Sequence, residues 1–147
     1  MPLLGFGVYQ NYTTRDSVLE AFKAGYRHVD SAQAYRNEAG VGEAVRESGI
    51  ARGDLFISKC PSFHLCSILT DLQRPNASQR LTDTRAPSKG VDESLSKFQF
   101  GANRRAHYID LFLIHDPFSG TERRLATYKA LLEAKAAGKI RSVGVSN

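Results

Sequence analysis

Short apolar stretches alternate with longer amphipathic stretches along most of this chain of 147 residues. The apolar stretches predict five strands, at Leu3–Val8, Tyr26–Asp30, Leu55–Ser58, Ile109–Ile114 and Ser142–Val145. In the amphipathic stretches apolar residues recur every three or four positions, which indicates helices with one apolar side. These helices are expected after Thr13 and Thr14, at Glu38–Ser48, through Val91, Leu95 and Phe98, and at Thr121–Ala137, where Leu125, Tyr128 and Leu132 share one side.

Near-continuous apolar strands between amphipathic helices are typical of the α/β class, with a parallel sheet covered by helices. Glycine follows three of the four predicted helices, at the position where a left-handed backbone often ends a helix. The hydrophobic pattern leaves two architectures open, which are a doubly wound sheet and a (β/α)8 barrel. The length fits one domain over residues 1–147.

Residues 61–90 interrupt this alternation of strands and helices. The stretch is polar and turn-rich, and its apolar residues recur with no clear period. A structureless segment of this length is uncommon inside a compact domain. One interpretation is a mobile loop over the site, and the other is an irregular insertion that contributes nothing. We favour the insertion, because removing Phe63 to Ser88 joins the third strand smoothly to the helix at Val91. The insertion would then derive from an unspliced or misannotated stretch of coding sequence.

Composition narrows the function classes only slightly. The net charge of +5 would suit an anionic partner, but Lys and Arg are spread along the chain, which favours a solvated surface. The sequence contains no nucleic-acid-binding motif, no signal peptide pattern and no apolar run of membrane-spanning length. Cys60 and Cys66 match no zinc or redox spacing, so we expect no metal and a reduced, cytoplasmic protein.

Three ionisable residues, Asp30, Lys59 and His115, directly follow or end predicted strands. Catalytic groups of parallel βα folds gather at the C-terminal ends of strands, so these side chains are expected to converge on one pocket. Tyr35 lies five residues beyond Asp30, in the loop before the next helix. Each residue alone has a structural alternative, such as a helix cap or a solvated lysine, but their joint placement favours catalysis.

The four residue types make a chemically coherent set. Tyrosine is a weak acid with a pKa of about 10, and a nearby ammonium lowers that value. An aspartate beside the lysine holds the ammonium in its charged form, and a histidine donates a hydrogen bond to an oxygen that gains negative charge. Together they would protonate a carbonyl oxygen while hydride arrives at carbon. The hydride must come from a cofactor, because no side chain supplies one.

Four stretches of the chain resemble successive segments of the aldo-keto reductase family. The first runs from Gly25 to Gly42 and is similar to the signature around the family's catalytic Asp and Tyr. The others resemble the strands that bear the catalytic Lys, the catalytic His and the Ser-Asn pair that contacts the nicotinamide carboxamide; they are Ile57–Lys59, Ile109–Pro117 and Gly138–Asn147. The resemblance covers everything except about residues 61–90.

The resemblance implies a (β/α)8 barrel that reduces a carbonyl to an alcohol with NADPH. It makes Tyr35 the general acid, Lys59 the group that lowers its pKa, and Asp30 the partner of Lys59. His115 would orient the carbonyl of a small-molecule substrate. The resemblance further implies cofactor contacts at Gly7, Val8, Asp30, Ser146 and Asn147, and substrate contacts at Tyr9, Tyr35 and His115.

Two departures limit what the resemblance implies about specificity. Many family members have Thr and then Trp where this chain has Val8 and Tyr9. Val8 removes a hydroxyl near the cofactor, and Tyr9 provides a smaller aromatic wall. The sequence therefore assigns no particular substrate.

The last predicted strand ends close to Asn147, whereas a (β/α)8 barrel typically takes about 250 residues. We therefore expect an incomplete barrel, truncated after its fifth strand and lacking the family's main site for the 2′-phosphate of NADPH. Open sheet edges would favour self-association. Two functions remain open: NADPH-dependent carbonyl reduction, and a catalytically inactive fragment or binding partner.

Overall fold

The computed structural model describes residues 1–60, 86–100, 107–114 and 120–146. Residues 61–85 of the predicted insertion therefore lie outside the described residues, whereas residues 86–90, expected to be irregular, form the start of a helix. Within them the chain forms one five-stranded sheet of order β1-β2-β3-β4-β5, and all neighbouring pairs are parallel. The strands are β1 (Phe6–Gly7), β2 (His28–Ala32), β3 (Phe56–Cys60), β4 (Ile109–Ile114) and β5 (Ile140–Val145).

The five predicted parallel strands are thus confirmed, with shifts at several ends. The first strand is shorter than predicted, because Leu3 and Leu4 are exposed and make no ladder with β2. The described residues also form four α-helices and two 3-10 helices. They are α1 (Thr14–Lys23), α2 (Glu38–Glu47), α5 (Ala86–Phe98), α6 (Thr121–Ala136), η1 (Gln33–Tyr35) and η2 (Arg52–Asp54).

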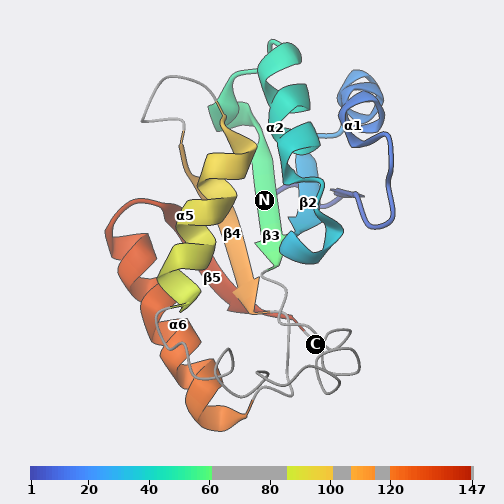
Figure 1. The fold of residues 1–147 in the computed structure, drawn as a ribbon. Helices are drawn as coiled ribbons and strands as arrows, with labels where there is room; N and C mark the ends of the chain where they lie inside the picture. Colours follow the sequence, from blue (N-terminus) through green and yellow to red (C-terminus); the bar gives the residue numbers. More distant parts are fainter. Residues whose placement is uncertain (61–85, 101–106, 115–119, 147) are drawn as a thin grey trace, which may run out of the picture.

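The helices pack side by side in chain order and cover one face of the sheet (Figure 1). The core lies between these two layers, where Val29, Ile57 and Phe112 project from the three central strands and are fully buried or nearly so. Helices α2 and α5 approach closely at Gly42. A Cβ atom at that position would lie 1.6 Å from the carbonyl oxygen of Phe98.

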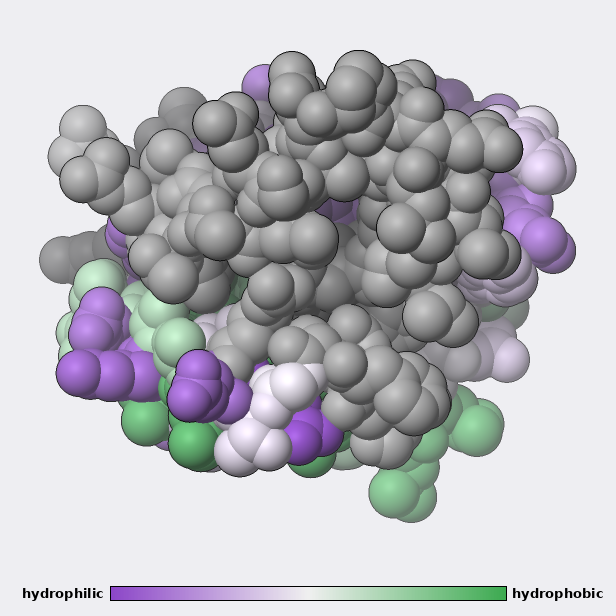
Figure 2. All heavy atoms as spheres, turned by 60° about the horizontal axis from the view of Figure 1, so that its bottom comes forward, coloured by the Kyte–Doolittle hydropathy of each residue, from purple (hydrophilic) through white to green (hydrophobic). Residues whose placement is uncertain are grey.

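Helix α6 packs a different side against the sheet from the side that the spacing of its apolar residues predicted. Leu125, Tyr128 and Leu132 are 65%, 38% and 45% exposed, whereas Leu131 and Ala134 face the core. Figure 2 looks onto the end of the molecule where β3 and β4 finish. Hydrophobic and hydrophilic residues lie side by side at the edge of this view. The sheet is open, with β1 and β5 at its two ends, as expected for part of a barrel.

The register of the sheet decides which side chains share a face. Asp30 lies opposite Ser58 across the β2–β3 ladder, and Ser31 lies opposite Lys59. Residues paired in a ladder point to the same face, while successive residues of a strand point to opposite faces. Asp30 and Ser58 therefore belong to the face without helices, and Lys59 belongs to the face that the helices cover.

Candidate active site

Asp30 is held by a short hydrogen-bonded chain on the open face of the sheet. Its carboxylate accepts a hydrogen bond of 2.5 Å from the Ser58 hydroxyl, and the Ser58 oxygen lies 2.9 Å from His28 Nε2. Burial is the largest influence on His28 and lowers the pKa of its imidazole, although the Asp30 carboxylate opposes this shift. These contacts fix the position of the Asp30 carboxylate.

Tyr35 ends the short η1 helix that follows β2, and its surroundings hold the loop in place. Arg36 directly after it adopts a left-handed backbone with φ of 55°. The Asn37 side chain donates a hydrogen bond of 2.8 Å to the Val8 carbonyl and accepts one of 3.1 Å from the Ser31 hydroxyl. The ring of Tyr9 packs on Tyr35, with 5.0 Å between ring centroids.

The groups around Tyr35 shift its pKa in one direction. Its pKa is raised, first by partial burial, then by the Asp30 carboxylate, and further by Cys60 and Tyr9. Each of these influences disfavours the phenolate. The expected effect of Lys59 on the pKa of Tyr35 stays a prediction.

Lys59 lies on the helix-covered face and forms no pair with Asp30. Its side chain is completely buried, forms an ion pair with the Glu38 carboxylate of α2, and donates a hydrogen bond to the Ser94 hydroxyl of α5. Lys97 approaches the same carboxylate at 3.3 Å. Burial, with a smaller effect of the Lys97 ammonium, lowers the pKa of Lys59, whereas the adjoining Glu38 carboxylate stabilises the charged form.

Cys60 takes the position on the open face that the sequence interpretation gave to Lys59. It lies opposite Ala32 in the β2–β3 ladder, two residues beyond Ser58 and therefore on the same face as Asp30. The residue is 6% exposed, and burial raises the pKa of its thiol to about 11. Alternation along β3 is the physical reason that Lys59 and Asp30 are separated.

The other predicted site residues divide into four groups. Gly7 pairs with Asp30, and a side chain built there would meet no heavy atom within 4 Å, so this position is open. Val8 is completely buried, and its amide donates to the Asp30 carbonyl at 3.1 Å, so the structure does not offer its side chain to a cofactor. Ser146 is half-buried, with its amide bonded to the Ile114 carbonyl. His115 and Asn147 lie outside the described residues.

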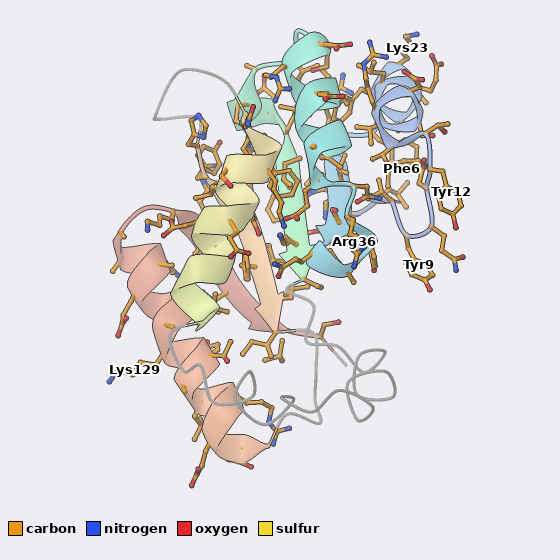
Figure 3. All side chains as sticks on the ribbon, viewed as in Figure 1. Phe6, Tyr9, Tyr12, Lys23, Arg36 and Lys129 are labelled. Atoms are coloured by element: carbon orange, nitrogen blue, oxygen red, sulfur yellow. The ribbon has the colours of Figure 1, made fainter. Side chains whose placement is uncertain are left out.

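A hollow of about 510 Å³ lies beside Tyr35, between the loop after β1 and the loop after β2. Tyr12 and Arg36 contribute to its wall, and they lie on the same side of the molecule as Tyr9 (Figure 3). The guanidinium of Arg15, also in this wall, is paired with Glu47. Tyr35 forms part of the wall of this hollow, whereas Asp30, Gly7 and Tyr9 do not.

No metal-binding cluster and no membrane-spanning helix is found in the part of the chain that the structure describes. Among these residues, no group of three or more His, Cys, Asp or Glu side chains is placed to hold a metal ion. None of the described helices is long and apolar enough to cross a membrane.

Sequence reasoning missed three residues that shape this region, namely Ser58, Cys60 and Glu38. Ser58 and Cys60 are the neighbours of Lys59 in β3, so the strict alternation of a strand could have marked them as the residues on the Asp30 face. Glu38 was recognised only as part of the family-like stretch. Its role as the buried counterion of Lys59 depends on the packing of α2 against β3.

Comparisons with known proteins agree on one family. The family model described as "Aldo/keto reductase family" matches residues 5–147. Relatives include an aldo-keto reductase of Mycolicibacterium smegmatis, 34% identical, and methylglyoxal reductase DkgB of Yersinia pestis, 37% identical. Both alignments use 100% of this chain but only 46% and 48% of the relative. The chain thus spans about half the length of the relatives it matches.

Solved structures give the same result. An aldo/keto reductase of Brucella melitensis superimposes with a TM-score of 0.79 and 35% identity, over 100% of this chain and 50% of that structure. The aldo-keto reductase AKR2E4 of Bombyx mori, solved in complex with NADP, gives a TM-score of 0.74 and 25% identity, over 99% and 46%. The described sheet and helices therefore correspond to about half of each of these structures.

Proposed function

Because this chain belongs to the aldo-keto reductase family, we propose that it serves, as part of a (β/α)8 barrel, in the reduction of a small carbonyl compound to an alcohol. The observation that supports this most directly is that Tyr35, in η1 directly after β2, is close enough to Asp30 of β2 for that carboxylate to raise its pKa. Tyr35 also borders a hollow large enough for a small molecule. Relatives named as methylglyoxal and glyoxal reductases favour a small dicarbonyl substrate.

Tyr35 is the proton donor in this proposal. Its raised pKa keeps the phenol protonated at neutral pH, so the proton is available to the carbonyl oxygen. The same shift makes Tyr35 a weak acid, so the described residues predict slow turnover. Tyr9, whose ring is tilted against that of Tyr35, would line the substrate side, and His115 would orient the carbonyl.

NADPH is the proposed hydride donor, and a solved relative with bound NADP supports this choice. Of the positions assigned to the cofactor, Gly7 is open on the Asp30 face and leaves room for a ring to approach the sheet. Ser146 follows β5 and is half-buried. The Val8 side chain is not available for direct contact with the cofactor, because it is completely buried.

The test is binding followed by turnover. Purified protein is titrated with NADPH while the nucleotide fluorescence is recorded, and methylglyoxal-dependent loss of absorbance is then followed. We expect saturable binding, and a loss of turnover of about a hundredfold or more when Tyr35→Phe removes the proton donor. Tyr12→Phe is the matched control, because Tyr12 borders the same hollow but is 95% exposed. Equal turnover by Tyr35→Phe and the unmodified chain would contradict the proposal.

A second candidate function, a non-catalytic partner protein, is favoured by the position of Lys59. The ammonium that should assist Tyr35 lies in the helix-covered core instead. Since that ammonium is paired to Glu38, it is not available to Tyr35 in this arrangement, which suits a binding role better than chemistry. Absence of NADPH binding together with a stable dimer in light scattering would support this alternative.

A further inference from the structure

A hollow in the described part of the chain brings Tyr35 together with residues that the proposed function does not use. It has a volume of about 510 Å³, and its wall is formed by residues 11–16, where α1 begins, and by residues 35–37 and Gly40, where α2 begins. Gly40 allows the two segments to approach closely, because a Cβ atom there would lie 3.2 Å from that of Thr14. The hollow is thus shaped by the starts of two helices, and Tyr35 connects it to the proposed chemistry.

The polar side chains that α1 contributes to this wall are already paired within the chain. The Arg15 guanidinium forms ion pairs with Glu47 of α2 and with Asp16. The Thr14 hydroxyl donates a hydrogen bond of 2.8 Å to the Asn11 carbonyl. These contacts hold α1 against α2 and stabilise the wall, so these groups are not free to bind a ligand.

Arg36 is different, because its side chain makes no hydrogen bond or ion pair with any residue that the structure describes. It follows Tyr35 directly and ends η1 with a left-handed backbone, at φ of 55°. The next residue, Asn37, donates a hydrogen bond to the Val8 carbonyl, which fixes this loop. Tyr12 also has an unpaired hydroxyl, but its side chain is 95% exposed and encloses little. Arg36 therefore supplies the unpaired positive charge of the described wall.

We propose that this hollow binds the carboxylate of a carbonyl substrate, and that Arg36 selects for it. The proposal rests on the function proposed above and narrows its substrate class to carbonyl compounds that carry a second, negatively charged group. An arginine guanidinium remains charged at neutral pH and binds a carboxylate through two parallel N–H···O hydrogen bonds. Because Tyr35 and Arg36 are adjacent, one molecule can present its carbonyl oxygen to Tyr35 and its carboxylate to Arg36.

The experiment compares two substrates that have the same reacting aldehyde but differ in charge. NADPH-dependent turnover of 4-carboxybenzaldehyde and of its methyl ester gives a ratio of kcat/KM. We expect the full chain to prefer the carboxylate by about tenfold or more, and Arg36→Gln to reduce this preference to about twofold or less, mainly through KM. The control is Lys129→Gln, which removes the same charge from an exposed position of α6 (Figure 3). An unchanged preference in Arg36→Gln, or an equal loss in Lys129→Gln, overturns the proposal.

Binding without turnover separates this proposal from the function on which it rests. Benzoate is titrated into the full chain and followed by ligand-observed NMR, and circular dichroism establishes that each variant is folded. Benzoate binding that is about tenfold weaker in Arg36→Gln but not in Lys129→Gln supports the carboxylate site, even where turnover is absent and the proposed function fails. Methylglyoxal turnover by a chain that binds no benzoate overturns the carboxylate site and leaves the proposed function standing. Displacement of benzoate by an equal concentration of inorganic phosphate would show a general anion site and would also overturn the selection for a carboxylate.

Discussion

The Arg52 guanidinium lies 2.7 Å from the Asp110 carboxylate, and these two side chains are only 7% and 3% exposed. Asp110 also accepts a hydrogen bond of 2.9 Å from the Ile57 amide, and Arg141 approaches its other oxygen at 3.3 Å. One carboxylate thus connects η2, β3, β4 and β5.

Replacing Asp110 with asparagine should destabilise the fold strongly. Asp110→Asn leaves the Arg52 guanidinium buried without its counterion, and such losses amount to about 3–5 kcal/mol. Urea unfolding followed by circular dichroism measures the change. The control is Asp92→Asn, which removes an exposed ion pair with Lys139 and should cost less than about 1 kcal/mol. Similar losses of unfolding free energy in both variants would contradict a special stabilising role for the buried contacts of Asp110.

Replacing Glu38 with a neutral residue should lower the free energy of unfolding only while Lys59 remains charged. Glu38→Gln leaves a completely buried ammonium without its contacting carboxylate, so we expect the free energy of unfolding to fall by about 3 kcal/mol or more. Adding Lys59→Met should recover most of that loss, because the pair is then replaced by two uncharged groups. A double-mutant cycle in urea measures the coupling, and simple additivity would contradict a direct ion pair.

Two helical glycines should respond to alanine in opposite directions. In Gly42→Ala the new methyl group meets the Phe98 carbonyl, so α2 and α5 must separate, and we expect a loss of about 3 kcal/mol. Gly90→Ala in α5 adds a methyl group where no heavy atom lies within 4 Å, and it should stabilise the protein by about 0.5–1 kcal/mol. Thermal unfolding compares the two. A neutral Gly42→Ala would mean that the helices are not in contact there.

The Cys60 thiol should react slowly with iodoacetamide, and its reaction rate should depend steeply on pH. Burial raises its pKa from 9.0 to about 11, so at pH 8 the thiolate is about a hundredfold scarcer than in the unfolded chain. Iodoacetamide labelling of a Cys66→Ser variant, with and without urea, measures the ratio by mass spectrometry. Because the unfolded thiol ionises first as pH rises, the free energy of unfolding should also fall above about pH 9. Equal labelling rates in both states would contradict a buried thiol.

Much of the helical layer could be predicted because hydrophobic spacing is a local property. The helix predicted at Glu38–Ser48 is present, and its apolar residues Val41, Ala44 and Val45 are each at most 4% exposed. The same reasoning chose the wrong side of α6, where Leu131 is buried and Leu125 is 65% exposed. Spacing identifies an apolar side, but the position of the helix at the margin of the sheet decides which side is covered.

The sequence by itself determined the order of strands and helices, the family-like stretches, and the placement of Asp30 and Tyr35 near one strand end. These features follow from short-range patterns of residue types. Only the tertiary structure decided that Lys59 faces the helices while Ser58 and Cys60 face Asp30. The reason is that side chains alternate along a strand, so a face is assigned only once the register with neighbouring strands is known. A residue of the expected type beside the expected strand end can therefore still lie on the wrong face of the sheet.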